Sequence, residues 1–332
     1  MRWLKGLLVL LMILVIVYLL GPHPATPKYD IAMPAMPAIN YLEKYVAANE
    51  AVHKLRPNNE ARIVWANDSI KQKTDYAIVY LHGFSASQEE GDPVHRNIAK
   101  QFGCNLYLAR LAEHGIDTTE QLVNLTADNY WKSAQQALAI GKLLGNKVIL
   151  MGTSTGGTQA LQLAATYPND VAALVLYSPN IAINDPFAWV LNNNWGLQIA
   201  RLVKGGNYNI SDDERPLYKQ YWNTRYRLEA AAALEEMLET TMNKETFARV
   251  KQPTLLLYYY KDEQHQDSVV KVSAMKKMYA ELATADSFKR AIALPNTGGH
   301  VIASPIKSKD VVSVEKETKR FFEEVIHLQA KK

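Results

Sequence analysis

The chain has 332 residues, of which 48% are hydrophobic and 21% are charged, an ordinary globular composition with ample length for a large core. Its formal net charge is only +4 and no cluster of Lys and Arg stands out, so the sequence does not favour nucleic acid as a partner. The single cysteine, Cys104, excludes an internal disulfide, and its apolar neighbours predict a buried core residue rather than a catalytic thiol.

The N-terminal segment differs from the rest of the chain. Arg2 and Lys5 precede a nearly unbroken apolar run that continues to Leu20. A transmembrane helix needs about 20 apolar residues, and the end of this run lacks the small residues of a signal-peptide cleavage site. We therefore predict an uncleaved signal anchor over residues 1–21, with its basic end in the cytoplasm and the remainder of the chain periplasmic or otherwise extracytoplasmic. Secretion after signal cleavage is the alternative.

The next part of the chain alternates between two kinds of apolar pattern. Residues 22–38 are rich in Pro and Ala and predict an extended tether. From residue 39 to residue 179, continuous apolar runs alternate with amphipathic stretches. The runs lie at 62–66, 76–81, 105–109, 147–151 and 171–177, and the predicted helices at about 38–55, 93–101, 127–144 and 155–167. Continuous runs are typical of strands buried on both faces, so the pattern predicts an α/β fold with a mostly parallel central sheet and helices on both faces.

The alternation stops after residue 179 and resumes at about residue 251. The intervening residues 180–250 contain no obvious strand, and we interpret them as a helical insertion. A strand at 253–260, a helix at 273–282, a strand at 290–294 and a helix at 311–328 then complete the pattern. The sequence therefore predicts one core built from residues 39–179 and 251–332, with a single insertion between its two parts.

A nucleophile is predicted where one strand meets the next helix, in Gly152-Thr153-Ser154-Thr155-Gly156. In that setting Gly-x-Ser-x-Gly is typical of a sharp, strained turn whose small neighbours avoid Cβ clashes. The turn holds the Ser154 hydroxyl above the sheet and aims the N–H groups of the helix start at whatever the serine attacks. An ordinary glycine-rich turn is the alternative interpretation.

A serine nucleophile needs a base, and the base needs a group to orient it. In open α/β sheets such groups lie beyond the carboxyl ends of the strands, and among eight histidines His300 has that position, just past a strand. Asp262 and Asp267 both follow the strand that ends at Tyr260 and are the candidate acids. Asp262 has the usual distance from the strand and Asp267 the usual distance to the next helix. The sequence favours Asp267 and leaves Asp262 open.

The oxyanion of a tetrahedral intermediate needs N–H donors. The Thr155 N–H, at the helix start, is one predicted donor. The Phe84 N–H is the other, because Gly83 lets the backbone approach a substrate beyond the strand that ends at Leu81. This chemistry is complete without a metal or an organic cofactor, so none is predicted.

The ordered set of motifs resembles the α/β-hydrolase fold family, most closely its lid-bearing carboxylesterases and monoacylglycerol lipases. The motifs are His82-Gly83-Phe84, Glu113-His114-Gly115, the serine turn, the acid loop and Gly299-His300, and the resemblance covers residues 60–328. The resemblance implies nucleophile, acid and base in chain order and a lid formed by residues 180–250. Two features depart from the family pattern: Glu113 stands where glycine is usual, and the acid loop is long and lacks the usual glycine after the strand.

The site and the resemblance together predict a serine hydrolase that cleaves carboxylic esters through an acyl-enzyme. The insertion carries many large apolar side chains, among them Trp189 and Trp195, which predict an apolar wall around a small-molecule apolar ester. A peptidase, amidase or thioesterase on the same fold is one alternative, and a non-catalytic hydrolase-like binding module is another. The N-terminal helix makes a membrane the second predicted partner, and no obligate protein partner is evident.

Overall fold

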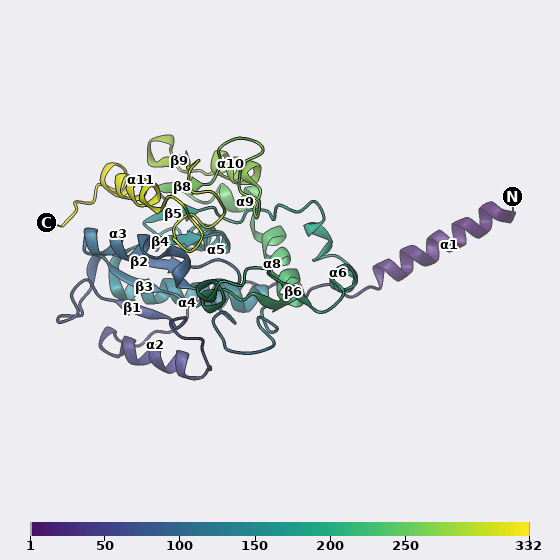
Figure 1. The fold of residues 1–332 in the computed structure, drawn as a ribbon, viewed down its shortest axis with the longest axis horizontal. Helices are drawn as coiled ribbons and strands as arrows, with labels where there is room; N and C mark the ends of the chain where they lie inside the picture. Colours follow the sequence, from purple (N-terminus) through teal and green to yellow (C-terminus); the bar gives the residue numbers. More distant parts are fainter. Residues whose placement is uncertain (1, 332) are drawn as a thin grey trace.

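The computed structural model describes residues 2–331 and contains a twisted sheet with helices on both faces (Figure 1). The strand order is β1-β3-β2-β4-β5-β8-β9. The strands are β1 (Arg62–Val64), β2 (Thr74–Leu81), β3 (Asn105–Leu108), β4 (Gly145–Thr153), β5 (Ala173–Tyr177), β8 (Thr254–Tyr258) and β9 (Lys289–Ala293). Only β1 pairs antiparallel; the other neighbours are parallel. The predicted α/β fold with a mostly parallel sheet is confirmed.

The hydrophobic core has one part on each face of the sheet. Alternate residues of β2 point to opposite parts: Val79 lies in one cluster and Ile78 in the other. The first cluster includes side chains from α4 (Ala127–Leu144), α5 (Thr155–Thr166) and α10 (Val272–Glu281), and the second includes side chains from α3 (Val94–Phe102) and α11 (Val311–Glu324). Because both faces are buried, the strands are apolar throughout rather than alternating.

The register of the central strands brings the loops that follow them together. Leu81 at the end of β2 pairs with Gly152 of β4, and Thr153 of β4 pairs with Tyr177 of β5. In parallel strands the carboxyl ends lie at one edge of the sheet. The segments that begin at His82 and Ser154 therefore start beside each other.

The insertion is mostly helical but also contains a short strand pair that the sequence did not predict. Its elements are η3 (Ala188–Val190), α6 (Gly196–Lys204), β6 (Tyr208–Ile210), α7 (Pro216–Tyr221), β7 (Arg225–Arg227), α8 (Leu228–Thr241) and α9 (Lys244–Phe247). Strands β6 and β7 pair antiparallel over three residues each. Such short strands show no measurable alternation of apolar residues, which is why the sequence pattern does not reveal them.

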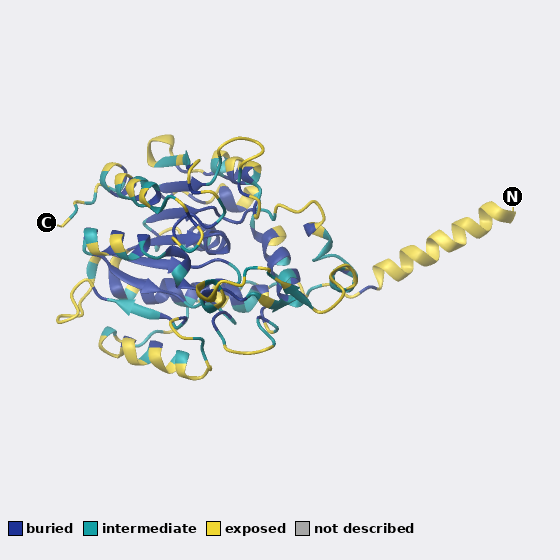
Figure 2. Ribbon diagram, in the orientation of Figure 1, coloured by how far each residue is buried: buried dark blue, intermediate teal, exposed yellow. Residues whose placement is uncertain are grey.

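Helix α1 (Arg2–Leu19) extends away from the body of the protein and is exposed along its length (Figures 1 and 2). By length and composition it is apolar enough to cross a membrane. Its carboxyl end meets the insertion, where the Trp195 indole N–H donates to Val17 O at 2.9 Å and the Asn194 amide donates to Tyr18 O at 3.0 Å. Helix α1 is thus attached to the insertion by hydrogen bonds.

Residues 22–38 contain no strand and no helix, as expected for an extended segment, but most of their length is docked on the core. The N–H groups of Lys28 and Tyr29 both donate to Asp128 Oδ1 at 2.9 Å. The Trp131 indole N–H donates to Asp30 O at 2.8 Å. These bonds attach residues 28–30 to helix α4.

Candidate active site

Ser154 occupies a strained turn between β4 and α5. Its φ of 52° and ψ of −121° lie outside the ordinary regions for a non-glycine residue. The two neighbouring glycines are required by space: a Cβ on Gly156 would lie 1.9 Å from Leu81 O, and a Cβ on Gly152 would lie 2.5 Å from the Gly156 carbonyl carbon. Ser154 itself is only 6% exposed. The turn has the geometry that the Gly-x-Ser-x-Gly pattern predicts.

His300 and Asp267 form a buried pair beside this turn. His300 Nδ1 lies 2.7 Å from Asp267 Oδ2, and Asp267 Oδ1 accepts the N–H groups of Val269 and Val270 at 2.9 and 3.1 Å. Burial by itself would raise the pKa of Asp267, but the charge and hydrogen bond of His300 and the two N–H bonds outweigh burial and lower it. Burial would lower the pKa of His300, but the charge and hydrogen bond of Asp267 and the charge of Glu90 raise it.

The second candidate acid lies elsewhere. Asp262 is exposed, and its carboxylate accepts the His265 ring N–H at 2.8 Å and the Gln264 N–H at 3.0 Å. The acid loop turns back on itself around these contacts. The structure therefore brings Asp267, and not Asp262, to His300.

The two predicted oxyanion donors are free to bind a substrate. The N–H groups of Phe84 and Thr155 donate to no other group within residues 2–331. The Ser85 N–H, next to Phe84, donates to His114 Nε2 at 3.0 Å. This bond links the loop after β2 to the loop that carries His114.

His82 and His114 support that loop as neutral rings. His82 Nδ1–H donates to Gly83 O at 2.9 Å, and its Nε2 accepts the Leu111 N–H at 3.0 Å. Burial lowers the pKa of His82 to about 4 and lowers that of His114 as well. The bond from the Ser85 N–H to His114 Nε2 braces the loop.

Glu113 adopts a left-handed backbone, with φ of 66°. This is the position at which the resembling family usually has glycine, and glycine reaches that φ at no steric cost. The His114 side chain that follows Glu113 is anchored by its bonds to Ala112 O and the Ser85 N–H.

Ser154 and His300, the predicted nucleophile and base, are not joined by a hydrogen bond in the described part of the chain. Among the bonds of the described residues, His300 is bonded to Asp267 and none links it to Ser154 Oγ. Serine–base bonds are often longer in unliganded sites and shorten when substrate binds. The acid–base pair is therefore formed, whereas the serine–base bond is open.

The insertion covers the site loops with side chains other than the two predicted tryptophans. Tyr221 and Trp222 are buried against Ala86 and Val301, which lie in the loops that carry Phe84 and His300. The Tyr226 ring packs edge-on to Phe84 with centroids 5.0 Å apart. Aromatic side chains of the segment between α7 and α8 therefore close the region around both loops.

Trp189 and Trp195 have different surroundings. Trp189 is 55% exposed, and the Trp195 N–H groups donate to Val17 O and Pro22 O. These contacts place Trp195 at the end of helix α1. They do not support the predicted role of these two residues as an acyl-binding wall. The apolar composition of the insertion predicts that its large side chains pack against another apolar group. It does not distinguish a bound substrate from the N-terminal segment of the same chain.

The sequence also missed a buried carboxylate. Glu90 lies on η2 (Gln88–Gly91), is 2% exposed, and accepts the Gly83 N–H at 2.6 Å. Two successive glutamates in a loop normally indicate a solvated turn. Only the folding of the loop against β2 brings this side chain inside.

Two cavities among the described residues are lined by residues other than Ser154. One, of about 330 Å³, lies between residues 22–27 and helices α6 and α8, and Ala232 and Leu197 are among its lining residues. The other, of about 370 Å³, is mainly polar and lies on the acid loop beside Asp267 and Lys271. His300 lines neither of these two cavities. Within residues 2–331 no cluster of three or more His, Cys, Asp or Glu side chains could hold a metal ion.

Comparison with known families and proteins agrees with this geometry. A family model described as the alpha/beta hydrolase fold matches residues 76–277. Among curated proteins, monoacylglycerol lipase ABHD6 of Homo sapiens is 34% identical over 103 residues. That match covers 31% of this chain and 30% of the human protein, so the chain spans under a third of the length of this relative.

Solved structures with the same fold cover most of the chain. The structure reported for the metagenome-derived lipolytic enzymes LipS and LipT has a TM-score of 0.65 at 16% identity and covers 81% of this chain and 99% of its own. A Paleococcus ferrophilus monoacylglycerol lipase has a TM-score of 0.58 at 15% identity and covers 80% and 98%. Est1E of Butyrivibrio proteoclasticus with bound ferulic acid has a TM-score of 0.56 at 15% identity and covers 81% and 95%. At such identities the likeness shows a shared fold.

Proposed function

Because this chain belongs to the α/β-hydrolase fold family, we propose that it is a serine hydrolase that cleaves carboxylic esters through an acyl-enzyme. Relatives that are lipases and esterases support ester hydrolysis in general. The observation that carries the serine mechanism is the His300–Asp267 pair, 2.7 Å apart, at the sheet edge where Ser154 is held at a φ of 52°. A strained serine beside an oriented imidazole is the arrangement that nucleophilic catalysis requires.

Each residue of the site then has a defined task. Ser154 Oγ attacks the ester carbonyl while His300 Nε2 takes its proton. Asp267 holds the Nδ1–H of His300 and stabilises the imidazolium. The N–H groups of Phe84 and Thr155 bind the oxyanion. His300 returns the proton to the leaving alcohol, and water then hydrolyses the acyl-enzyme by the same steps.

We propose an apolar ester as the substrate, taken up at a membrane surface. The aromatic cover formed by Tyr221, Trp222 and Tyr226 favours apolar groups near Ser154. Residues 180–250 would act as the lid, and α1 as an anchor that keeps the catalytic domain on the extracytoplasmic side. A protein secreted after signal cleavage is the alternative to the anchored form.

A fluorophosphonate probe tests the proposal, because it labels only an activated serine. We expect rapid labelling of the wild-type protein and none of Ser154→Ala. A Ser178→Ala variant is a matched control, since that serine also follows a buried strand and has a positive φ of 42°. Lack of labelling in the folded wild-type protein would instead favour a non-catalytic hydrolase-like binding module.

The bond that is cleaved is tested separately. Matched ester, thioester and amide substrates with one acyl group would be compared by kcat/KM. The ester should be the fastest of the three. An amide or peptide cleaved faster than its ester would identify the enzyme as an amidase or peptidase, and a preferred thioester would identify it as a thioesterase.

A further inference from the structure

Glu90 is a buried carboxylate that the mechanism above does not use. It lies on η2, seven residues after Gly83, and accepts the Gly83 N–H at 2.6 Å through Oε2. Gly83 immediately precedes Phe84, whose N–H is a proposed oxyanion donor. The bond therefore holds the peptide next to the one that would face the oxyanion.

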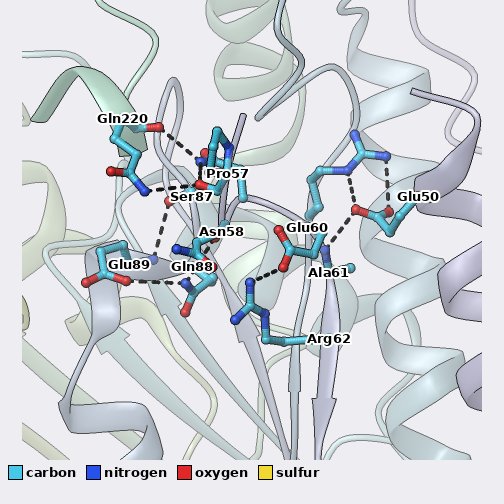
Figure 3. A network of polar contacts seen from close by, with 12 residues as sticks. Glu50, Pro57, Asn58, Glu60, Ala61, Arg62, Ser87, Gln88, Glu89 and Gln220 are labelled. Atoms are coloured by element: carbon cyan, nitrogen blue, oxygen red, sulfur yellow. Dashed lines mark hydrogen bonds and ion pairs between the residues drawn. The ribbon is translucent and has the colours of Figure 1, made fainter. Parts of the chain in front are cut away.

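The turn that carries Glu90 is held firmly. Ser87 caps η2: its Oγ accepts the Glu89 N–H at 3.4 Å, and its carbonyl accepts the Glu90 N–H at 3.2 Å. The Gln88 side-chain amide donates to Asn58 O at 3.5 Å, and the ring N–H of His95 donates to Gln88 O at 2.8 Å. Figure 3 shows Ser87, Gln88 and Glu89 bridged in this way to the loop of Asn58. These contacts fix the position of the Glu90 carboxylate.

The carboxylate also lies beside the nucleophile. A Cβ built on Gly83 would lie 2.9 Å from Glu90 Oε2 and 2.9 Å from Ser154 Cβ. Glu90 Oε2 and Ser154 Cβ therefore lie on either side of the space that a methyl group on Gly83 would fill. Gly83 has to be glycine for this approach, and a carboxylate so close to the serine acts on the charges that form there.

No cation is paired with this buried carboxylate in the described chain. Its hydrogen bond from Gly83 is the one it makes, and His300 is the nearest group that becomes positive during the reaction. The other titratable groups in its field are the hydroxyls of Tyr80 on β2, Tyr130 on α4 and Tyr218 on α7. Burial raises the pKa of Glu90 to about 7, while the Gly83 N–H bond and the charge of His300 oppose that rise. A buried charge without a permanent partner is costly, so its retention calls for a function.

We propose that Glu90 is a positioning residue of the active site: it fixes the Gly83 peptide so that the Phe84 N–H faces the oxyanion, and its charge stabilises the His300 imidazolium. The inference rests on the proposed function of Ser154 and His300. The Gly83 N–H, occupied by Glu90, does not bind the oxyanion, whereas the Phe84 N–H stays free. The charge of Glu90 raises the pKa of His300, and the charge of His300 lowers the pKa of Glu90, as expected for opposite charges.

Two substitutions separate the hydrogen bond from the charge. Glu90→Gln keeps an acceptor for the Gly83 N–H but removes the charge. Glu90→Ala removes both the acceptor and the charge. Glu89→Gln is the matched control, because Glu89 is the neighbouring carboxylate on η2 but is only half-buried and does not contact Gly83. The pH dependence of kcat/KM would be measured on p-nitrophenyl acetate for all four proteins.

We expect Glu90→Ala to lower kcat by about ten-fold or more with little change in KM, since losing one oxyanion donor costs about 10² to 10³. Glu90→Gln should keep most of the plateau rate, but the rise of kcat/KM with pH should move to lower pH, because His300 is protonated less readily. Glu89→Gln should change neither. An unmoved pH profile in Glu90→Gln, together with wild-type kcat in folded Glu90→Ala, would overturn the proposal.

A measurement without substrate distinguishes this inference from the proposed function. The His300 ring would be titrated by NMR in Ser154→Ala and in Ser154→Ala with Glu90→Gln. We expect the second protein to titrate at lower pH. If the wild-type protein is not labelled by fluorophosphonate, the proposed function fails, and this titration still decides whether Glu90 acts on His300. Equal titration curves in the two proteins would refute the electrostatic role, even if Glu90→Ala had misfolded.

Discussion

His300 Nδ1 lies 2.7 Å from Asp267 Oδ2, and the other oxygen of Asp267 is held by two backbone N–H groups. The carboxylate can therefore neither rotate nor move away without losing three bonds. This fixed orientation distinguishes Asp267 from Asp262, whose contacts are with its own exposed loop.

The first prediction compares these two acids. Asp267→Asn should lower kcat by about 10⁴, because the imidazole loses the group that sets its tautomer and stabilises its charged form. Asp262→Asn, the matched control, should keep near-normal kcat. The measurement is kcat on p-nitrophenyl acetate. Equal and small effects from both substitutions would mean that another group orients His300.

The second prediction concerns the pH dependence of stability. The pKa of His300 is raised, so its contribution to the free energy of unfolding is full below the unfolded pKa and is lost as pH rises through the folded pKa. The pKa of Asp267 is lowered, so its contribution is full above the unfolded pKa and is lost as pH falls through the folded pKa. Both contributions are present between about pH 4 and pH 6.5.

The difference in unfolding free energy between wild type and Asp267→Asn should therefore be larger at about pH 5.5 than at about pH 9. Urea denaturation at both pH values, on the protein without helix α1, measures this difference. A difference that grows toward pH 9 would contradict the ionic coupling of this pair.

The third prediction concerns the N-terminal segment. Deleting residues 1–27 removes α1 but leaves the Tyr29 and Asp30 contacts, so the product should be soluble and active. Deleting residues 1–38 also removes the hydrogen bonds from Trp131 and Gln135 to Asp30 O and from Tyr167 to Ile31 O. At about 1 kcal/mol per bond, the longer deletion should lower Tm by several degrees.

Thermal unfolding and esterase rates of the two truncated proteins test this comparison. A folded 28–332 protein that has lost all activity on soluble esters would mean that the N-terminal segment is part of the catalytic unit. Equal Tm values would show that the docking of residues 28–38 contributes no stability.

The fourth prediction concerns the acyl group. If the acyl chain is buried, each methylene should raise kcat/KM by a factor of about 4 from acetyl to hexanoyl esters. Tyr226→Ala should flatten this rise, because Tyr226 packs on Phe84 at the site. Trp195→Ala should leave the profile unchanged, because the Trp195 indole is bonded to Val17. A rate that falls steadily from acetyl upward would favour a small-acyl esterase.

The fifth prediction concerns the glycines around Ser154. In Gly156→Ala the new Cβ would lie 1.9 Å from Leu81 O, a backbone atom that cannot move freely. The protein should lose about 1–3 kcal/mol of stability, as in other overpacked sites. Gly206→Ala is the control, since nothing lies within 4 Å of its new Cβ, and it should be neutral or slightly stabilising. Urea denaturation measures both, and equal stabilities would contradict the steric argument.

The sequence by itself determined the fold and the places where chemistry could occur. Continuous apolar runs arise because strands such as β2 are buried on both faces, and that property is local to each strand. The turn at Ser154 is likewise determined by adjacent residues, because only glycine fits at position 156. The position of His300 follows from where its strand ends, since parallel strands share one functional edge.

Only the tertiary structure decided which side chains meet. Asp262 and Asp267 differ by five positions in one loop, and the fold of that loop, closed on Asp262 by His265, decides which of them reaches His300. Glu90 is buried because its turn folds back onto Gly83, although its sequence resembles a solvated turn. Trp195 is apolar in every setting, but its partner is the end of α1, almost 180 residues earlier in the chain. A local sequence pattern reflects the spacing of apolar residues and the size of their side chains. Contacts between distant segments depend instead on the conformations of the loops that connect them.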